Sequence, residues 1–349
     1  MLHTGLVGAG MWGRTHALAY HTHPGARLMA VCDVDEARAR ALAAEFGIPR
    51  VYASAEDLAA DPDIHAVSVA TPDFAHVAPA LAVIRERKPL LVEKPLATTV
   101  EDALAIAGAA EAAGILAMVD FHNRFNVQFD TAKKRIGDGP IGAVRHLYVR
   151  HNVTRAFPLD MLRWRDRSSA LWFIGSHSAD LARWLVGDEV AEVYAVSTRG
   201  ILDAEGADTT DTWASTLRFR GGAVAVLENS WALPRNVPGW GDFRTEIIGE
   251  HGVNYTHLQA PEVNELYTER EHQRNDFLLQ LDIQGRQFGF TLQSIQYFAD
   301  CVIADRVPFI SLRDGVQNTR ILCALEESAR AGRPVSLAGD PGDASGARS

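Results

Sequence analysis

The stretch Gly8-Ala9-Gly10-Met11-Trp12-Gly13 decides how the first part of this 349-residue chain folds. A short apolar run at 2–7 comes directly before it, and a pattern of helical period at 12–21 begins inside it. Between a strand and a helix, the first glycine permits a tight turn, the second lets the backbone approach a pyrophosphate, and the third allows close helix packing. The helix N-terminus, at Met11 and Trp12, then presents amide groups to the phosphate charge. The stretch therefore predicts a dinucleotide-binding turn.

The sequence around this turn alternates short β-branched runs with longer alanine-rich runs of helical period. Such alternation is typical of a parallel sheet that helices cover on both faces. Residues 1–121 therefore predict an α/β domain of the Rossmann type, with a doubly wound parallel sheet. We expect its further strands at 27–32, 65–70, 89–93 and 115–120, and its further helices at 35–46, 54–60, 75–87 and 99–113.

Asp33 stands twenty residues beyond Gly13, at the end of the second expected strand. A carboxylate at this place accepts hydrogen bonds from the adenosine ribose hydroxyls and repels a 2′-phosphate. Neither Val34 nor Asp35 supplies a cation to offset that repulsion. The predicted cofactor is therefore NAD rather than NADP. The alternative is an ordinary glycine loop with Asp33 as a helix cap, which does not account for strand, loop, helix and acid occurring in order.

After residue 121 the apolar runs become longer, contain more Val, Trp and Tyr, and are joined by glycine turns. This pattern predicts a second domain at 122–334, of the α+β type, with a large, open and mainly antiparallel sheet. Residues 335–349 are rich in Gly, Ala, Ser and Asp, and we expect a flexible tail there. The expected strands are 143–154, 190–200, 212–219, 223–231, 243–248 and 253–258, and the expected helices are 170–186, 291–305 and 312–331.

The composition narrows the classes of function. The formal net charge is −10, and no run of Lys or Arg offers the basic stripe that nucleic acid binding needs. No apolar segment reaches the roughly 18 residues of a membrane span, and the N-terminus lacks the pattern of an export signal. We therefore expect a cytoplasmic protein that binds neither nucleic acid nor membrane. His16, His21 and His23 gather near one helix end without a carboxylate or cysteine at ligand spacing, so no metal site is expected.

The fourth expected strand ends abruptly in two opposite charges, Glu93 and Lys94, followed by Pro95. The carboxyl edge of such a sheet is where ligands bind. A lysine beside an oxidised nicotinamide experiences a like charge, which lowers the lysine pKa and favours the neutral amine that accepts a substrate proton. Taken alone, the two residues are more typical of a solvated ion pair.

Four motifs, in order along the chain, resemble those of the Gfo/Idh/MocA family, named for glucose-fructose oxidoreductase, inositol dehydrogenase and rhizopine catabolism. The similarity covers nearly the whole chain, including its ending from Phe298 to Val335. The motifs are Gly8-Ala9-Gly10-Met11-Trp12-Gly13, Ala70-Thr71-Pro72-Asp73-Phe74-Ala75-His76, Glu93-Lys94-Pro95-Leu96 and Gly175-Ser176-His177-Ser178-Ala179-Asp180.

The resemblance implies an enzyme that moves a hydride between a pyridine nucleotide and a secondary alcohol or ketone carbon of a sugar, cyclitol or glycoside. It implies that Lys94 and His177 are catalytic, and that the chain forms a homodimer or homotetramer through the sheet of its second domain. Lys94, Asn123, Arg124 and His177 are expected to contact the substrate. The resemblance also places at the cofactor Ala70, Thr71, Pro72, His76, Glu93 and Lys94.

One position departs from the family pattern. The motif usually reads Asp-x-x-x-His, whereas the residue four before His177 is Phe173, which neither accepts a hydrogen bond nor carries charge. Asp160, Asp166 or His151 then takes over the role of the missing acid. Asp180 is a further candidate for substrate contact or for bracing its helix. Trp164, Trp172, Phe157 and Phe173 either form an apolar wall for a sugar ring or belong to the core.

Two other functions compete with a dehydrogenase. Transient oxidation of one carbon can labilise a glycosidic bond while the cofactor is regenerated, which gives a redox-neutral glycoside-cleaving enzyme. A non-enzymatic NAD-binding sensor is compatible with the loss of the acid at Phe173. Against the sensor, a pure binding module has no chemical need for both Lys94 and His177.

Overall fold

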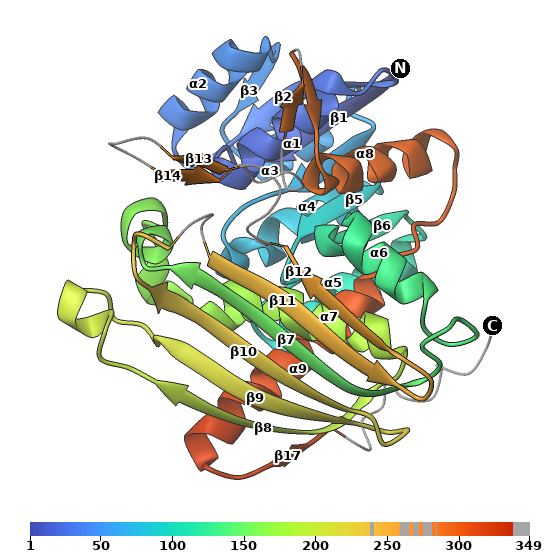
Figure 1. Ribbon diagram of the computed structural model, residues 1–349. Helices are drawn as coiled ribbons and strands as arrows, with labels where there is room; N and C mark the ends of the chain where they lie inside the picture. Colours follow the sequence, from blue (N-terminus) through green and yellow to red (C-terminus); the bar gives the residue numbers. More distant parts are fainter. Residues whose placement is uncertain (238–240, 259–264, 268–271, 275–280, 284, 338–349) are drawn as a thin grey trace. The chain divides into compact units, whose positions relative to one another are not determined.

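The computed structural model describes residues 1–237, 241–258, 265–267, 272–274, 281–283 and 285–337. The chain forms two compact units, Met1–Val127 with Asp276–Thr319 and Gln128–Asn275 with Arg320–Ser349 (Figure 1). These units differ from the predicted domains because residues 276–319 belong with the first unit.

The first unit contains a six-stranded parallel sheet of order β3-β2-β1-β4-β5-β6 (Figure 1). This order reverses direction beside β1, as in doubly wound dinucleotide-binding sheets, and it confirms the predicted fold class. One strand, Arg50–Tyr52, was not predicted, because three residues are too short to show an alternating pattern. The strands are β1 (Leu2–Val7), β2 (Ala26–Cys32), β3 (Arg50–Tyr52), β4 (Ala66–Val69), β5 (Leu90–Glu93) and β6 (Ala117–Asp120).

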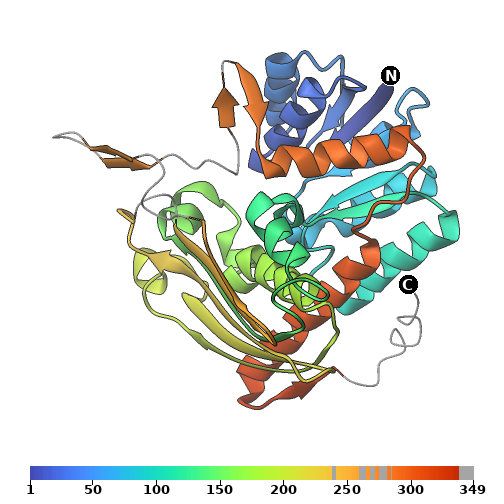
Figure 2. The ribbon, with the colours of Figure 1, turned by 45° about the vertical axis from the view of Figure 1, so that its right-hand side comes forward.

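Helices of the first unit follow its strands, as predicted. They are α1 (Met11–Thr22), α2 (Glu36–Phe46), α3 (Ala55–Ala60), α4 (Val77–Arg85), α5 (Val100–Ala113) and α8 (Phe290–Ile303). Although α8 comes late in the chain, it packs beside α1 (Figure 2). The core is formed by aliphatic side chains of the strands and alanines of the helices. Alanine lets a helix approach a sheet closely, so the alanine-rich runs suit this packing.

The second unit contains a seven-stranded sheet of order β12-β11-β7-β10-β9-β8-β17. Only the pair β7 and β10 is parallel among its described pairings, so the predicted mainly antiparallel sheet is confirmed. Its strands are β7 (Val144–Thr154), β8 (Val190–Thr198), β9 (Thr212–Phe219), β10 (Val224–Leu233), β11 (Gly241–Gly249), β12 (Val253–His257) and β17 (Val335–Ser336).

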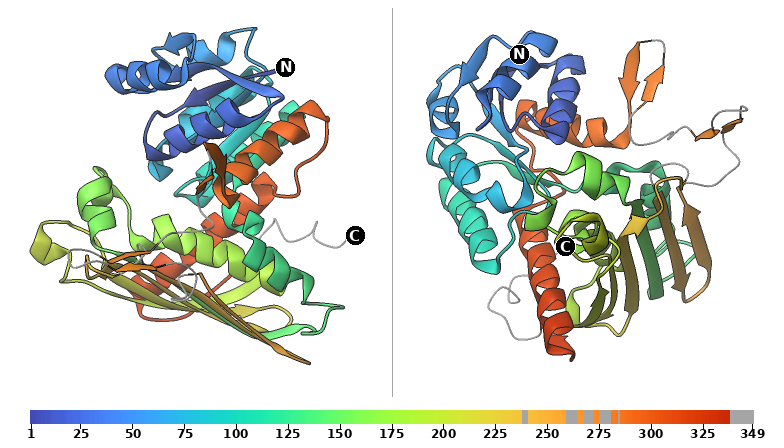
Figure 3. Two further views of the ribbon diagram at one scale, coloured as in Figure 1. Left: turned by 45° about the horizontal axis from the view of Figure 1, so that its top comes forward. Right: turned by 90° about the vertical axis from the view of Figure 1, so that its left-hand side faces the viewer.

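One face of this sheet is covered by α7 (Ser176–Val186) and the end of α9 (Leu312–Ala331), as the left view of Figure 3 shows. A hydrogen bond also joins α9 to the sheet, because the Ala195 backbone N–H of β8 donates to Ser328 Oγ at 3.0 Å. Ile321 and Leu325 of α9 belong to the core of this unit together with side chains of the sheet.

Several elements of the second unit differ from the predictions. The expected helix 170–186 is a π-helical turn at Leu171–Gly175 followed by α7. Helix α6 (Val127–Lys134) was not predicted. Val335 and Ser336 were expected in a flexible tail, yet they pair with β8 as strand β17, while 338–349 lie outside the described residues. Two short strands of this unit, β13 (Glu265–Tyr267) and β14 (His272–Arg274), were also not predicted, nor were β15 (Leu281–Ile283) and β16 (Arg286–Phe288) of the first unit.

Among the described residues, no helix combines the length and the apolar character needed to cross a bilayer.

Candidate functional site

The glycine turn after β1 has the geometry that its sequence predicts. Gly8 has a φ of +102°, and a Cβ there would lie 2.6 Å from the Ala70 carbonyl oxygen. A Cβ at Gly13 would lie 2.0 Å from the Gly8 carbonyl oxygen, so only glycine permits this approach of helix and turn. At Gly10, by contrast, a Cβ would meet nothing within 4 Å. The turn therefore leaves open space where a pyrophosphate would approach the backbone, and it fits a dinucleotide.

Asp33 is tied to this turn. Its Oδ2 accepts a hydrogen bond from the Ala9 backbone N–H at 2.7 Å, and its Oδ1 accepts one from the Asp35 N–H at 2.8 Å. The carboxylate is thus held beside the turn, where it suits the ribose hydroxyls of a dinucleotide. Arg38 Nη1 lies 3.8 Å from Asp33 Oδ2. Sequence reasoning missed this cation, because it considered only the two residues directly after Asp33.

His76 connects two predicted cofactor segments. Its Nε2 lies 2.9 Å from the Thr71 carbonyl oxygen, and its Nδ1 lies 2.7 Å from the Pro95 carbonyl oxygen. The Thr71 hydroxyl in turn donates to the Ala75 carbonyl oxygen at 3.0 Å. The fully buried His76 therefore holds the turn after β4 against the segment after β5. Its predicted contact with the cofactor, like those of Ala70, Thr71 and Pro72, stays a prediction.

Glu93 and Lys94 stand at the carboxyl end of β5, and both are buried rather than solvated. Burial lowers the pKa of Lys94, although the negative charges of Glu93, Asp73 and Asp120 oppose this shift. Burial by itself would raise the pKa of Glu93, but the hydrogen bond and charge of His16, with the charges of His122 and Lys94, hold it below its usual value. The alternative of a solvated surface ion pair is therefore wrong.

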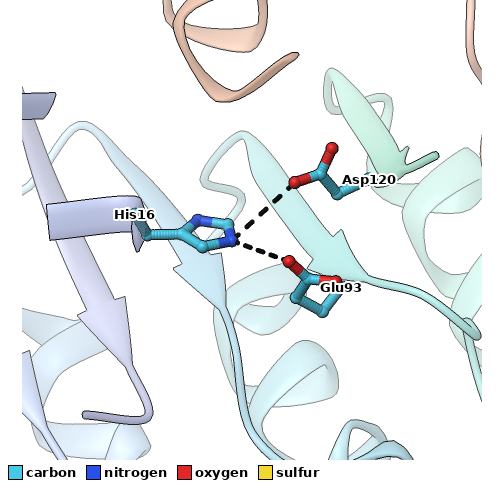
Figure 4. A group of neighbouring side chains, drawn as sticks. All are labelled: His16, Glu93 and Asp120. Atoms are coloured by element: carbon cyan, nitrogen blue, oxygen red, sulfur yellow. Dashed lines mark hydrogen bonds and ion pairs between the residues drawn. The ribbon is translucent and has the colours of Figure 1, made fainter. Parts of the chain in front are cut away.

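Three buried side chains meet at the carboxyl ends of β5 and β6 (Figure 4). His16 Nε2, from α1, lies 3.2 Å from Glu93 Oε1 and 3.9 Å from Asp120 Oδ2. Asp120 also accepts a hydrogen bond from the Ser294 hydroxyl of α8. Burial and the nearby charge of Glu93 raise the pKa of Asp120 well above its usual value, whereas the pKa of Glu93 is held below its own.

The ligand atoms of His16, Glu93 and Asp120 lie within 4.8 Å of one another, close enough to suggest a metal site. Two hydrogen bonds, one between His16 and Glu93 and one from Ser294 to Asp120, account for the close approach of these side chains. Sequence reasoning missed this cluster, because it looked for partners of His16 within a short spacing. The one available indication was that Glu93 and Asp120 both end parallel strands, and such ends lie at the same edge of a sheet.

The segment after β6 belongs to the first unit, not to the second domain as the predicted boundary at residue 121 implies. The His122 ring stacks on Trp12 with centroids 5.1 Å apart, and burial lowers the His122 pKa to about 4. Arg124 Nη2 donates to Asp314 Oδ1 at 3.2 Å. Asn123 and Arg124 are both buried. The predicted substrate contacts of Asn123 and Arg124 remain predictions.

In the second unit, His177 lies in the first turn of α7 and is almost fully buried. The next residue, Ser178, accepts a hydrogen bond from Asn229 Nδ2 of β10 at 2.8 Å. A Cβ at Gly175 would lie 3.2 Å from Asn229 Oδ1, so the glycine lets the helix start approach that strand. Asn229 thus holds the start of α7, which carries His177. Nothing in the sequence around Asn229 indicates this role. Asp180 is buried on the same helix.

His151, on β7, lies beside His177 with ring centroids 5.9 Å apart. Its ring stacks on Phe243 of β11, with centroids 4.0 Å apart and planes 4° from parallel. Asn229 Nδ2 also lies 3.4 Å from the His151 carbonyl oxygen. The structure therefore brings together these two sequence-predicted histidines and orients one of them by stacking.

Phe173 occupies an aromatic cluster in the π-helical turn before α7. Its ring lies 5.0 Å from that of Phe157 and 5.9 Å from that of Trp164, measured between centroids. Phe173 and Trp172 are buried in the core of the second unit, and Phe157 and Trp164 pack against that core. Trp172 Nε1 donates to Glu326 Oε1 at 2.7 Å. Phe173 and Trp172 are therefore core residues, whereas a sugar contact of Trp164 stays a prediction.

The two aspartates that could replace the missing acid are engaged elsewhere. Asp160 pairs with Arg235, and its side chain is 54% exposed. Asp166 Oδ1 accepts a hydrogen bond from the Asp208 backbone N–H at 2.9 Å, and its side chain is 51% exposed. Among the three candidates, only His151 lies beside His177 in the contacts of the described residues. Lys94 and His177 belong to different units, and their convergence is a prediction.

Comparison with known proteins gives a consistent result. Residues 2–121 match the oxidoreductase family with an NAD-binding Rossmann fold, and residues 129–254 match the GFO/IDH/MocA C-terminal domain. The chain is 33% identical to inositol 2-dehydrogenase of Acidothermus cellulolyticus, over 97% of this chain and 95% of that protein. It is 29% identical to scyllo-inositol 2-dehydrogenase (NAD(+)) of Bacillus subtilis, over 95% of each chain.

Among solved structures, the chain resembles that of GenD2 from gentamicin A biosynthesis in complex with NAD. The TM-score is 0.81 at 25% identity, with 97% of each chain covered. The glycine turn and Asp33 described above fit the same cofactor. This chain is therefore an NAD-dependent oxidoreductase of the GFO/IDH/MocA family, acting on CH–OH groups.

Proposed function

We propose that this protein oxidises a secondary hydroxyl group of a cyclitol, or of a sugar or glycoside of similar shape, with Lys94 as the proton acceptor. The observation that carries this proposal is a buried lysine at the carboxyl end of β5, in the unit that holds the glycine turn. Relatives named for inositol oxidation support the substrate class. When bound, NAD supplies the hydride acceptor.

Each step that the chain itself performs follows from the chemistry of its side chains. Because burial lowers the pKa of Lys94, its Nζ is neutral at a lower pH than that of an exposed lysine. The neutral amine accepts the hydroxyl proton, and His177 orients that hydroxyl by hydrogen bonding. Oxidation is therefore expected to be fast above the Lys94 pKa and to be lost as the pH falls through it.

We infer that His151 replaces the carboxylate that family members carry at the position of Phe173. Stacking on Phe243 orients the His151 ring, which lies beside His177. His151→Phe retains a ring for this stack but removes both nitrogens, so kcat/KM should fall by about 10²-fold, as for a lost acid–base partner. Asp160→Asn and Asp166→Asn should retain the wild-type rate. A fall with either aspartate variant, and none with His151→Phe, would assign the role to that aspartate.

The main experiment measures NADH formation with a panel of inositols, aldoses and glycosides, for wild type and Lys94→Met. The variant should bind NAD as wild type does and lose about 10³-fold or more in kcat/KM. Lys134→Met is the matched control, because Lys134 is an exposed lysine paired with Asp130 at 2.6 Å. Turnover of Lys94→Met at the wild-type rate would disprove the role of Lys94. Cleaved glycoside without net NADH would instead indicate the redox-neutral reaction.

We also propose a homodimer or homotetramer formed through the sheet of the second unit. Its outward-facing side chains include Tyr194 and Val196 of β8, and Ile248 and Tyr255 of β11 and β12, all of which are exposed. These side chains lie on both sides of the central strands β7, β10 and β9. Exposed apolar side chains on a sheet are typical of an interface. Light scattering should report a multiple of the 38.1 kDa chain mass, and Tyr255→Arg should reduce it. A monomer at working concentration contradicts this assembly.

We propose the cytoplasm as its location, because Cys32, Cys301 and Cys323 form no disulfide with one another and the NAD pool is intracellular. Cell fractionation with an antibody against the chain tests this.

A further inference from the structure

His16 links the helix of the dinucleotide turn to the segment that carries Lys94 (Figure 4). It lies three residues after Gly13 and is fully buried. Its Nε2 lies 3.2 Å from Glu93 Oε1, and the other carboxylate oxygen, Oε2, accepts the Lys94 backbone N–H at 3.2 Å. One carboxylate therefore joins α1 to the backbone of Lys94.

We propose that His16 is a positioning residue for Lys94, and that it acts through the Glu93 carboxylate by hydrogen bonding and by charge. This inference rests on the proposed role of Lys94 as proton acceptor. His16 does not contact the reacting atoms in this scheme. It fixes the carboxylate that holds the Lys94 peptide, and its hydrogen bond weakens the pull of that carboxylate on a protonated lysine.

The charged side chains around Lys94 determine whether a substitution raises or lowers the Lys94 pKa. Lys94 is influenced by Glu93 of β5, Asp73 of the turn after β4, and Asp120 of β6. Burial and the charge of Glu93 raise the pKa of Asp120, whereas the pKa of Glu93 is lowered, so Glu93 is the stronger source of negative charge of the two. His122 is neutral at ordinary pH, since burial lowers its pKa to about 4.

Two nearby hydroxyl groups complete the surroundings. Tyr20 of α1 contacts Ser68 of β4 at 2.6 Å, and burial raises its pKa, so it is uncharged. Ser294 of α8 donates to Asp120. Glu93 is thus the main negative charge close to Lys94, and His16 is its hydrogen-bonded partner from a separate element. Removing His16 or removing the charge of Glu93 should shift the Lys94 pKa in opposite directions.

The experiment measures the Lys94 pKa directly. The chain contains only four lysines, Lys88, Lys94, Lys133 and Lys134, so protein labelled with ¹³C-lysine gives few Cε signals. The Lys94 signal is identified as the one lost in Lys94→Arg. Its titration is followed in the protein without cofactor, in wild type, His16→Leu and Glu93→Gln. His21→Leu, an exposed histidine on the same helix, is the matched control.

His16→Leu should raise the Lys94 pKa by about one unit, the scale expected for a nearby charge, and Glu93→Gln should lower it. The acid limb of the kcat/KM profile should move with the titration in each variant. His21→Leu should leave both unchanged. His16→Gln retains an N–H donor without the imidazole ring, and it serves the same test if His16→Leu does not fold.

A shift of the same sign in both variants would overturn the proposal, because loosened packing that admits water raises the lysine pKa in either case. An unchanged Lys94 titration in folded His16→Leu and His16→Gln would also overturn it. Neither result affects the role of Lys94, because the titration does not depend on turnover. Failure of the proposed function instead appears as full activity in Lys94→Met.

Discussion

Lys94 and His177 lie in surroundings of different kinds. Lys94 follows a parallel strand, beside two carboxylates that end neighbouring strands in register. His177 opens a helix that follows a π-helical turn, near a stacked histidine and a cluster of aromatic rings. The first environment is set by electrostatics among buried charges, and the second by the shapes of packed rings. Substitutions should therefore have different consequences in the two units.

Gly13→Ala should have the largest effect, because it places a Cβ 2.0 Å from the Gly8 carbonyl oxygen. Backbone atoms cannot move aside cheaply, so we expect a loss of about 3 kcal/mol in the free energy of unfolding, at the upper end for overpacking. Denaturant titration measures this loss.

Gly10→Ala is its control, since a Cβ there meets nothing within 4 Å and the φ of −77° suits alanine. Stability should stay near that of wild type, while the affinity for NAD falls because the methyl group occupies the space for the pyrophosphate. Equal stability of the two variants would contradict the assigned glycine roles.

His177→Phe should reduce kcat/KM by about 10²- to 10³-fold, the range of a lost acid–base group. The ring is retained, so the folded structure should persist, as circular dichroism can show. His146→Phe, on strand β7 and outside the proposed site, is the control and should keep the wild-type rate. If His177→Phe keeps the wild-type kcat/KM, the second unit contributes no acid–base group at this position.

Phe173→Asp tests whether the family's acid can simply be restored. The substitution removes an aromatic core side chain and buries a carboxylate beside Phe157 and Trp164. The free energy of unfolding should therefore fall by about 3 kcal/mol. Phe173→Leu is the control, with a smaller loss of about 1 kcal/mol. If Phe173→Asp is as stable as wild type and turns over faster, Phe173 does not have the core role assigned to it here.

Asp33→Asn should have the smallest effect. It removes the charge that repels a 2′-phosphate and leaves Arg38 nearby, so the preference for NAD over NADP should fall by about tenfold, or about 1.4 kcal/mol. Asp35→Asn, two residues on at the N-cap of α2, should leave the preference unchanged. The measurement is the ratio of kcat/KM with each cofactor, and an unchanged ratio in Asp33→Asn would assign selectivity to other residues.

The first unit could be predicted largely from its residues, because its site follows from local rules. The glycine turn, Asp33 and Glu93-Lys94 all lie at strand ends, and a parallel sheet brings its carboxyl ends to one edge whatever the connecting helices contain. Predictions failed where an element was too short to show a pattern, as at Arg50–Tyr52, or where the partner came from far along the chain, as Asp314 does for Arg124.

The order of motifs by itself determined the fold class, the NAD turn and the family of this protein, since periodicity and turn chemistry act over a few residues. Only the tertiary structure decided that His16 meets Glu93, that Asn229 holds the start of α7, and that Phe173 belongs to an aromatic cluster. These contacts join residues 51 to 77 positions apart, or depend on how rings pack. Packing and burial, which no local pattern encodes, set the charges and orientations on which the chemistry depends.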